Sequence, residues 1–356
     1  MFGEGVPVTT TTPLPKGELI DQRGRSELEF LQALRVGLAP LRTQVRERLD
    51  ATGILETPYE DISELRNRVD NELESVQVQR LIGAALSWSR GVATPRAAAA
   101  FERRRGELEP LATPIATVID HIGDDVPRYW DYEFHGTAGG WDGHPHMGFI
   151  HHEMIYHYLL EKIFPGDLFA QRGVIAAAAP ADSYTNIVDL GCGTGQYTLK
   201  LAETYPGAKI TAVDLSRTQV QYALRRAEDA GVTITGVHAA AEDTGLPAGE
   251  ADLVTSFILL HEVPPHTIRQ LFVEALRLLK PGGHVHFSDV APYSQRSPYQ
   301  AWLDDWDAAH GNEPWWRTAA TIDLVKAAAD AGFVDINQAA HGPQSYPWVT
   351  TARKPE

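Results

Sequence analysis

The stretch NIVDLGCGTGQYTLKLAE, residues 186–203, places three glycines and an aspartate between an apolar run and a run with helical spacing. This order predicts a buried strand, a glycine-rich turn and a helix. Such turns usually hold a phosphate, but the carboxylate of Asp189 beside this one disfavours a phosphate. The glycine spacing is G-x-G-x-G rather than the G-x-G-x-x-G of dinucleotide sites. We therefore expect a ligand without a phosphate at this turn.

Strand-like and helical runs alternate from Thr185 onward. The strand-like runs cover residues 186–190, 209–215, 233–239, 251–260 and 284–290, and residues 321–354 add one helix and two strands. Repeated β–α alternation favours parallel strands with right-handed crossovers. The sequence thus predicts an α/β fold with a doubly wound, mostly parallel, seven-stranded sheet of Rossmann-like type.

The sequence of the first 120 residues predicts helices and no strands. The expected segments are a loose tail over residues 1–17, a helix from Ser26 to Gly53 broken near Pro40, a helix over 61–91, and one over 95–120 interrupted by Pro110 and Pro114. A further helix is expected from about Gly148 to Phe164. We place a mainly helical domain at 18–180, covering the substrate and suited to dimer formation, and the α/β domain at 181–356.

Composition limits the class of protein. The 356 residues carry a formal net charge of −16, which speaks against broad nucleic-acid binding. Cys192 is the single cysteine, so no internal disulfide can form, and we read it as a small filler of the turn. No apolar run approaches the length of a membrane span. We expect a cytoplasmic protein with neither nucleic acid nor membrane as a partner.

Two acids mark the expected ligand. Asp189 ends the first strand of the α/β region, and Asp214 ends the second. An acid at the second place accepts hydrogen bonds from ribose hydroxyls, whereas one beside the turn favours an ammonium group. A nucleoside with an ammonium group and no phosphate fits both acids. S-adenosylmethionine is such a molecule and is the cofactor we predict.

Four motifs in order resemble the class I S-adenosylmethionine-dependent methyltransferases. They are VDLGCGTG (188–195), AVDLS (212–216), AAAEDTGLPAGEADLV (239–254) and LLKPGG (278–283). The resemblance covers roughly residues 180–350. It implies the fold predicted above and transfer of a methyl group from the cofactor.

The resemblance also assigns roles to residues. Asp189, Gly191, Gly193 and Gly195 would line the methionine end of the cofactor, Asp214 would hold the ribose, and Leu215 would face the adenine. Many relatives have an aspartate near the end of the third strand, where this chain has Ala240. The backbone of Ala241, or the carboxylates of Glu242 or Asp243, would then contact the adenine amino group.

His261 is the candidate general base. It follows the fourth strand in SFILLHEVP, in a place where small-molecule O-methyltransferases have a catalytic histidine. Asp289, at the end of the fifth strand, would orient it. The other reading is that His261 does no chemistry, as in many relatives. We expect the neighbouring Glu262 to be a solvent-facing cap.

Residues 128–165 are crowded with aromatic and histidine side chains. Six histidines fall between His135 and His157, and we weigh three readings: a metal site, a polar-aromatic lid over the substrate, and ordinary helix packing. We favour the lid and assign no metal ligand. The substrate-binding candidates are Trp141, His146, His151, His152 and, from an aromatic insertion, Trp302 and Trp306.

The expected activity is methylation of a small organic acceptor. We favour an oxygen as the acceptor atom, with carbon or nitrogen second. Lyase or pericyclic chemistry that uses the sulfonium without consuming it is another alternative, as is a metal-dependent enzyme built on the histidine tract. A homodimer is the assembly that the O-methyltransferase branch suggests.

Overall fold

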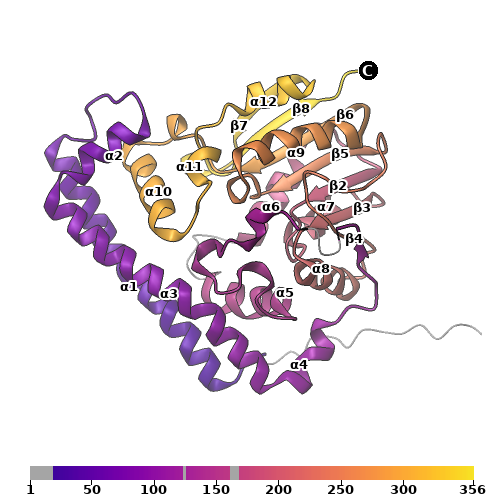
Figure 1. Cartoon of the computed structure of the whole chain (residues 1–356), viewed down its shortest axis with the longest axis horizontal. Coiled ribbons are helices and arrows are strands. Elements are labelled where there is room, and N and C mark those ends of the chain that lie inside the picture. Colours follow the sequence, from indigo (N-terminus) through magenta and orange to yellow (C-terminus); the bar gives the residue numbers. More distant parts are fainter. Residues whose placement is uncertain (1–18, 123–125, 161–167) are drawn as a thin grey trace, which may run out of the picture.

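The structure is a computed structural model that describes residues 19–122, 126–160 and 168–356. It consists of a twisted sheet with flanking helices and, beside it, a long pair of helices that runs along one side (Figure 1). The predicted tail at residues 1–17 lies outside the described residues.

One sheet contains all strands of the described residues, in the order β1-β4-β3-β2-β5-β6-β8-β7. β1 to β6 run parallel, and β8 is antiparallel to β6 and β7. The bounds are β1 (Ile119–Asp120), β2 (Asn186–Leu190), β3 (Lys209–Asp214), β4 (Thr235–His238), β5 (Ala251–Phe257), β6 (Leu279–Asp289), β7 (Val334–Ala340) and β8 (Trp348–Arg353). The α/β fold is confirmed, with β1 as an eighth, short strand in a stretch that we expected to be helical.

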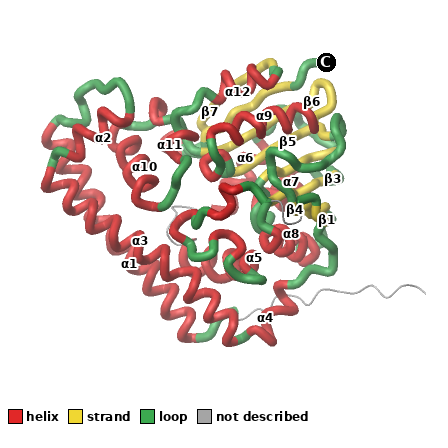
Figure 2. The backbone as a smooth tube through the Cα atoms, viewed as in Figure 1, coloured by secondary structure: helices red, strands yellow, loops and turns green. Residues whose placement is uncertain are grey.

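The chain order reverses at β2, which pairs with β3 on one side and β5 on the other. Ligands bind at such a switch point, outside the carboxyl ends of the strands. Helices cover the sheet (Figure 2): α6 (Leu168–Ala177), α7 (Gln196–Thr204), α8 (Arg217–Asp229), α9 (Pro265–Leu278) and α12 (Leu324–Ala331). Apolar residues of β2, β5 and β6 pack with those of α9 in the main core.

The N-terminal part is helical, with bounds that differ from those predicted. The helices are α1 (Gln22–Thr52), α2 (Ile62–Asp70), α3 (Leu73–Arg103) and α4 (Arg105–Ala112). Asp21, not Ser26, caps α1, which ends at Gly53 as predicted and continues through Pro40. The expected 61–91 helix is two helices, and α3 passes through Gly91. Packing between α1 and α3 outweighs the local preferences of Pro40 and Gly91.

The segment between the helical pair and the sheet consists of short helical turns and one longer helix. They are η1 (Arg128–Asp131), η2 (Phe134–Gly136), η3 (Gly140–Asp142), α5 (Met147–Phe149) and η4 (Ile150–Leu160). η4 is a π-helix, a form that is frequent at functional sites. A Cβ at Gly148 would lie 2.3 Å from the carbonyl oxygen of Thr218, so this glycine allows α5 to sit directly on α8. The end predicted for this helix, Phe164, lies outside the described residues.

The insertion after β6 joins the helical pair to the sheet. It contains η6 (Tyr293–Gln295), α10 (Pro298–Gly311) and α11 (Trp316–Ala319), and two short turns elsewhere are η5 (Leu260–Glu262) and η7 (Pro343–Ser345). Trp306 of α10 is 2% exposed, and a Cβ at Gly83 of α3 would lie 2.4 Å from its ring. Asp305, also buried, pairs with Arg66 of α2 at 2.7 Å and with Arg317 of α11 at 2.6 Å. Together these contacts fix α10 against the helical pair.

No helix within the described ranges is long and apolar enough to cross a membrane.

Replacing Trp306 by alanine should destabilise the fold, because the ring fills the contact between α10 and α3. We expect a loss of about 3–5 kcal/mol in the free energy of unfolding, measured by chemical denaturation. Trp88→Ala is the control, since Trp88 is 46% exposed, and it should cost about 1 kcal/mol or less. Equal losses in the two variants would contradict this account of the interface.

Candidate functional site

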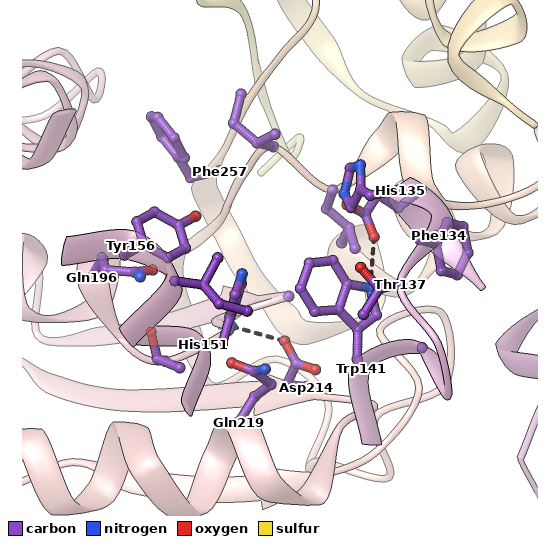
Figure 3. A pocket seen from close by; sticks show the side chains of 18 of the residues that line it. Phe134, His135, Thr137, Trp141, His151, Tyr156, Gln196, Asp214, Gln219 and Phe257 are labelled. Atoms are coloured by element: carbon purple, nitrogen blue, oxygen red, sulfur yellow. Dashed lines mark hydrogen bonds and ion pairs between the residues drawn. The ribbon is translucent and has the colours of Figure 1, made fainter. Parts of the chain in front are cut away.

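A cavity of about 470 Å³ opens at the carboxyl ends of β2, β3 and β5. Its walls come from the glycine turn, from the short turns of residues 128–160, and from α1 and α3. In the close-up, Asp214 and Gln219 lie at the base (Figure 3). Tyr156 and Gln196 lie on one side, and Trp141, His135 and Phe134 lie on the other (Figure 3).

The glycine turn has a backbone that other residues rarely adopt. Gly191, Gly193 and Gly195 have φ angles of 70°, 51° and 75°, in the left-handed region. A Cβ at Gly193 would meet no protein atom within 4 Å, whereas one at Gly195 would lie 3.0 Å from Ala223. Gly191 and Gly193 line the cavity. Gly195 instead is the N-cap residue of α7 and packs on α8.

Asp189 lies beneath the turn and is 1% exposed. Thr198 donates a hydrogen bond to its Oδ2 at 2.6 Å, and its Oδ1 is buried without a partner. Burial raises the pKa of this carboxyl to about 7, against the hydrogen bond from Thr198, which lowers it. The side chain is absent from the cavity wall, so it can favour a cation there only through its negative charge.

Asp214 lines the cavity at the end of β3. Its Oδ2 accepts a hydrogen bond from the backbone N–H of Gly193, and its Oδ1 accepts one from Ser216, both at 2.8 Å. Burial raises its pKa to about 7 in spite of these bonds. Each carboxylate oxygen has a second lone pair, which suits the two hydroxyls of a ribose.

The expected adenine end is formed by Leu215 and Ala241, which both line the cavity. Glu242 is held by the hydroxyl of Tyr129, which donates to its Oε1 at 2.7 Å, and Tyr129 itself lines the cavity. Asp243 is exposed. Of the three residues named as alternatives, Ala241 is the one that lines the cavity.

His261 and Asp289 form a buried pair. The Nδ1 atom of His261 lies 2.8 Å from Oδ1 of Asp289, and His261 lines the cavity. Asp289 is fixed in turn by the backbone N–H groups of Leu260 and Val290, at 2.6 and 2.7 Å. A carboxylate only accepts, so Nδ1 carries the hydrogen and Nε2 is the free basic atom of the neutral ring. Burial lowers the pKa of His261, but the charge of Asp289 outweighs it and raises the pKa to about 9.

Glu262 corrects one expectation, because it faces the cavity and not solvent. Trp141 donates through Nε1 to its Oε2 at 3.0 Å, and His135 Nε2 lies 3.0 Å from its Oε1. The other ring nitrogen of His135 contacts Glu313. Burial opposes the charge on His135, but the two carboxylates raise its pKa to about 10. This cluster ties the segment 128–142 to η5 and to the chain after α10.

The histidines that the sequence grouped together are spread over the structure. His144 and His146 contact Glu102 and Glu109, at 2.6 and 3.0 Å, away from the cavity. His152 is buried behind the glycine turn, near Thr194 and Gln196. His151 lines the cavity, and the centroids of its ring and the Trp141 ring are 4.9 Å apart. Burial lowers the pKa of His151 to about 4. Of the predicted substrate contacts in this segment, Trp141 and His151 reach the cavity.

One group within the described residues brings metal-ligating atoms together. The ligand atoms of His152, Glu153 and His157 lie within 4.8 Å of one another on η4. Tyr222 donates a hydrogen bond to Oε1 of Glu153 at 2.6 Å, and the positive charge of Arg226 lies close enough to lower the pKa of His152 further below the value set by burial. The hydrogen bond from Tyr222 and the charge of Arg226 both disfavour a bound cation. We therefore do not assign a metal site to these residues.

Trp302 and Trp306 lie outside the cavity wall. Trp302 is fully buried and donates through Nε1 to Asp70 at 3.3 Å, and Trp306 stacks on His310 with ring centroids 3.7 Å apart. Both belong to the contact of α10 with α2 and α3, and we do not carry them into the proposed site. His135, Glu313 and Tyr129 are cavity residues that we did not predict. The only sequence signal for these three residues was that their segments are rich in aromatic and acidic side chains.

Comparison with known proteins finds a family match for part of the sheet domain. Residues 187–283 match the family described as methyltransferase domain. The chain is 34% identical over 149 residues to malonyl-[acyl-carrier protein] O-methyltransferase of Hahella chejuensis, covering 41% of this chain and 50% of that protein. It is 32% identical over 120 residues to ubiquinone biosynthesis O-methyltransferase of Pectobacterium atrosepticum, covering 33% and 48%. The chain thus spans about half the length of these relatives.

Similar solved structures include a possible exported protein from Bordetella parapertussis, at 18% identity, with 91% of this chain and 97% of that chain covered and a TM-score of 0.44. Another is phosphoethanolamine N-methyltransferase 2 of Haemonchus contortus in complex with S-adenosyl-L-methionine, at 17% identity, 65% and 61% coverage and a TM-score of 0.45.

The raised pKa of Asp189 predicts how stability depends on pH. The folded state keeps this proton up to a pKa of about 7, whereas the unfolded chain loses it near the usual value of about 3.9. The free energy of unfolding should therefore fall as the pH rises from about 4 to about 7. In the Asp189→Asn variant this decrease in the free energy of unfolding should be smaller, by an amount on the order of a few kcal/mol. Denaturation curves recorded at several pH values measure it.

Asp330→Asn, at an exposed position of α12, is the matched control and should follow the unmodified protein. An Asp189→Asn variant with the same pH dependence as the unmodified protein would contradict the assignment of a buried, protonated carboxyl.

Proposed function

We propose that this protein, which carries a class I S-adenosylmethionine-dependent methyltransferase domain over residues 187–283, methylates an oxygen of a small organic acceptor. The observation that carries the proposal is the His261–Asp289 pair, because His261 lines the same cavity as the glycine turn and Asp214, and Asp289 holds it from behind. A base and a cofactor site in one cavity, with a carboxylate that orients the base, are the parts that such a transfer needs.

The residues present fit the cofactor. The space above Gly193 is open, Asp214 keeps free lone pairs at the cavity wall, and Oδ1 of Asp189 is buried without a partner. Gly191 and Gly193 would therefore adjoin the methionine part, Asp214 the ribose, and Leu215 and Ala241 the adenine. When bound, the cofactor supplies an electrophilic methyl group on a positively charged sulfur.

His261 would remove the proton of the acceptor. The bound cofactor would supply the methyl group that the acceptor oxygen takes up, and the hydroxyl proton would go to Nε2 of His261. Asp289 keeps Nδ1 protonated and stabilises the imidazolium that results. A pKa of about 9 leaves this histidine mostly protonated at neutral pH, so one proton must leave the complex before transfer. This requirement applies to an acceptor that binds as the alcohol, because one that binds as its anion has already lost that proton in solution.

The buried base supports oxygen as the acceptor atom, because a phenol or alcohol must lose a proton on methylation. The O-methyltransferases among the relatives add to this support. The cavity wall contains Tyr129, Trp130, Phe134 and Trp141, and such aromatic walls suit a flat organic acceptor and exclude water. Incubating a panel of phenols, carboxylic acids and amines with labelled cofactor, followed by fragmentation of the products, identifies the methylated atom.

Asp214→Ala should weaken binding of S-adenosylhomocysteine by about tenfold or more, since charge-assisted hydrogen bonds and the support of the turn are both lost. Calorimetry measures the affinity. The exposed Asp330→Ala is the control and should bind as the unmodified protein does. Unchanged affinity in Asp214→Ala would overturn the assignment of the cofactor site.

His261→Gln should lower kcat by about 10²–10⁴-fold and leave the affinity for S-adenosylhomocysteine unchanged. In the unmodified protein kcat/KM should rise with pH up to about 9, because the neutral imidazole is the base. The variant should lack this rise. His266→Gln changes a neighbouring exposed histidine and should keep both rate and pH profile. A rise that persists in His261→Gln would assign the base elsewhere.

A further inference from the structure

We propose that Arg35 and Arg90 form an anion-binding subsite at the helical end of the cavity, which receives a carboxylate or phosphate group of the acceptor. Arg35 belongs to α1 and Arg90 to α3, and both line the cavity. The inference rests on the proposed function, because it specifies the class of acceptor that the methyltransferase site would take.

Both arginines are held in place without an acidic partner. Arg35 donates through Nε to the hydroxyl of the buried Ser89 at 2.9 Å. Arg90 lies against the end of α10, where a Cβ at Gly311 would come within 2.3 Å of its Nη1. In its present position the guanidinium occupies the space that a Cβ at Gly311 would need. The terminal nitrogens of Arg35 make no hydrogen bond to any residue that the structure describes.

Arg35 and Arg90 lack a neighbouring carboxylate among the described residues, although the chain as a whole is acidic. The chain has 47 acidic residues against 31 lysines and arginines, and acids pair with other arginines of the helical part, such as Arg42 with Asp307 and Arg66 with Asp305. In the described part of the chain no carboxylate lies within 4.0 Å of Arg35 or Arg90. Burial and the charge of Arg90 lower the pKa of Arg35 to about 10. Two half-buried cations that line one cavity and whose charges act on each other are unfavourable unless an anion joins them.

The acids of the cavity do not serve as that anion. Glu262 and Glu313 both contact His135, on the segment between the helical pair and the sheet. A guanidinium pair offers several N–H donors that match the oxygens of a carboxylate or phosphate. The subsite therefore fits an anionic group of the bound molecule.

The anion could belong to the acceptor or to the cofactor, whose methionine part also has a carboxylate. The position of the pair favours the acceptor. Arg35 and Arg90 come from the helical pair, which lies across the short turns from the sheet (Figure 1), whereas the glycine turn lies at the carboxyl end of the central strand β2. An acceptor that reaches from His261 toward α1 and α3 would bring its anionic group to this pair.

The test is calorimetric titration of benzoate and of inorganic phosphate into the full-length protein, alone and saturated with S-adenosylhomocysteine. We expect at least one of these anions to bind, with an affinity that falls about tenfold or more in Arg35→Gln and Arg90→Gln. Arg35→Lys keeps the charge and should retain most of the binding. Arg80→Gln, at an exposed position of α3 outside the cavity wall, should bind as the unmodified protein does.

Three results would overturn the subsite: neither anion binds, the two glutamine variants bind both anions normally, or these variants lose affinity for S-adenosylhomocysteine and not for the anions. The last result would assign the pair to the cofactor. Failure of the unmodified protein to bind S-adenosylhomocysteine would instead refute the proposed function, and the titrations without it would still measure the anion site.

Discussion

The bond between the Asp214 carboxylate and the backbone N–H of Gly193 is the contact on which the site depends. It joins the end of β3 to the turn after β2, at the switch point of the sheet, and so sets the shape of the cavity floor. The turn can follow this path because its glycines accept left-handed backbone angles. Burial makes the charge of Asp214 unfavourable, and two backbone donors partly offset that cost.

Paired buried charges shape the rest of the cavity. Asp289 orients His261, Glu262 and Glu313 hold His135, and Asp305 fixes α10 against the helical pair with Arg66 and Arg317. Breaking such a pair leaves a buried charge unsatisfied, so each pair favours one arrangement of its segments. Arg35 and Arg90 depart from this pattern, which is why we infer a partner for them outside the chain.

Prediction from the sequence succeeded where a local pattern has one structural meaning. Alternating β–α runs led to the sheet, and the strand ends placed His261 near Asp289 and Asp214 near the turn. It was wrong at Pro40 and Gly91, where packing of α1 on α3 overrides the local preference to end a helix. The expectation that Glu262 faces solvent was also wrong. Its partners Trp141 and His135 lie more than a hundred residues away, so the sequence around Glu262 does not reveal them.

The sequence by itself determined the α/β fold, the glycine turn and the acids beside it, since these follow from residue periodicity and from backbone angles that only glycine readily adopts. The tertiary structure alone decided which aromatic and histidine residues face the cavity. Trp141 reaches it, whereas Trp302 and Trp306 fasten α10, and Arg35 and Arg90 both line it. Those contacts depend on how distant helices pack against one another, and side-chain burial is a property of that packing rather than of the local sequence.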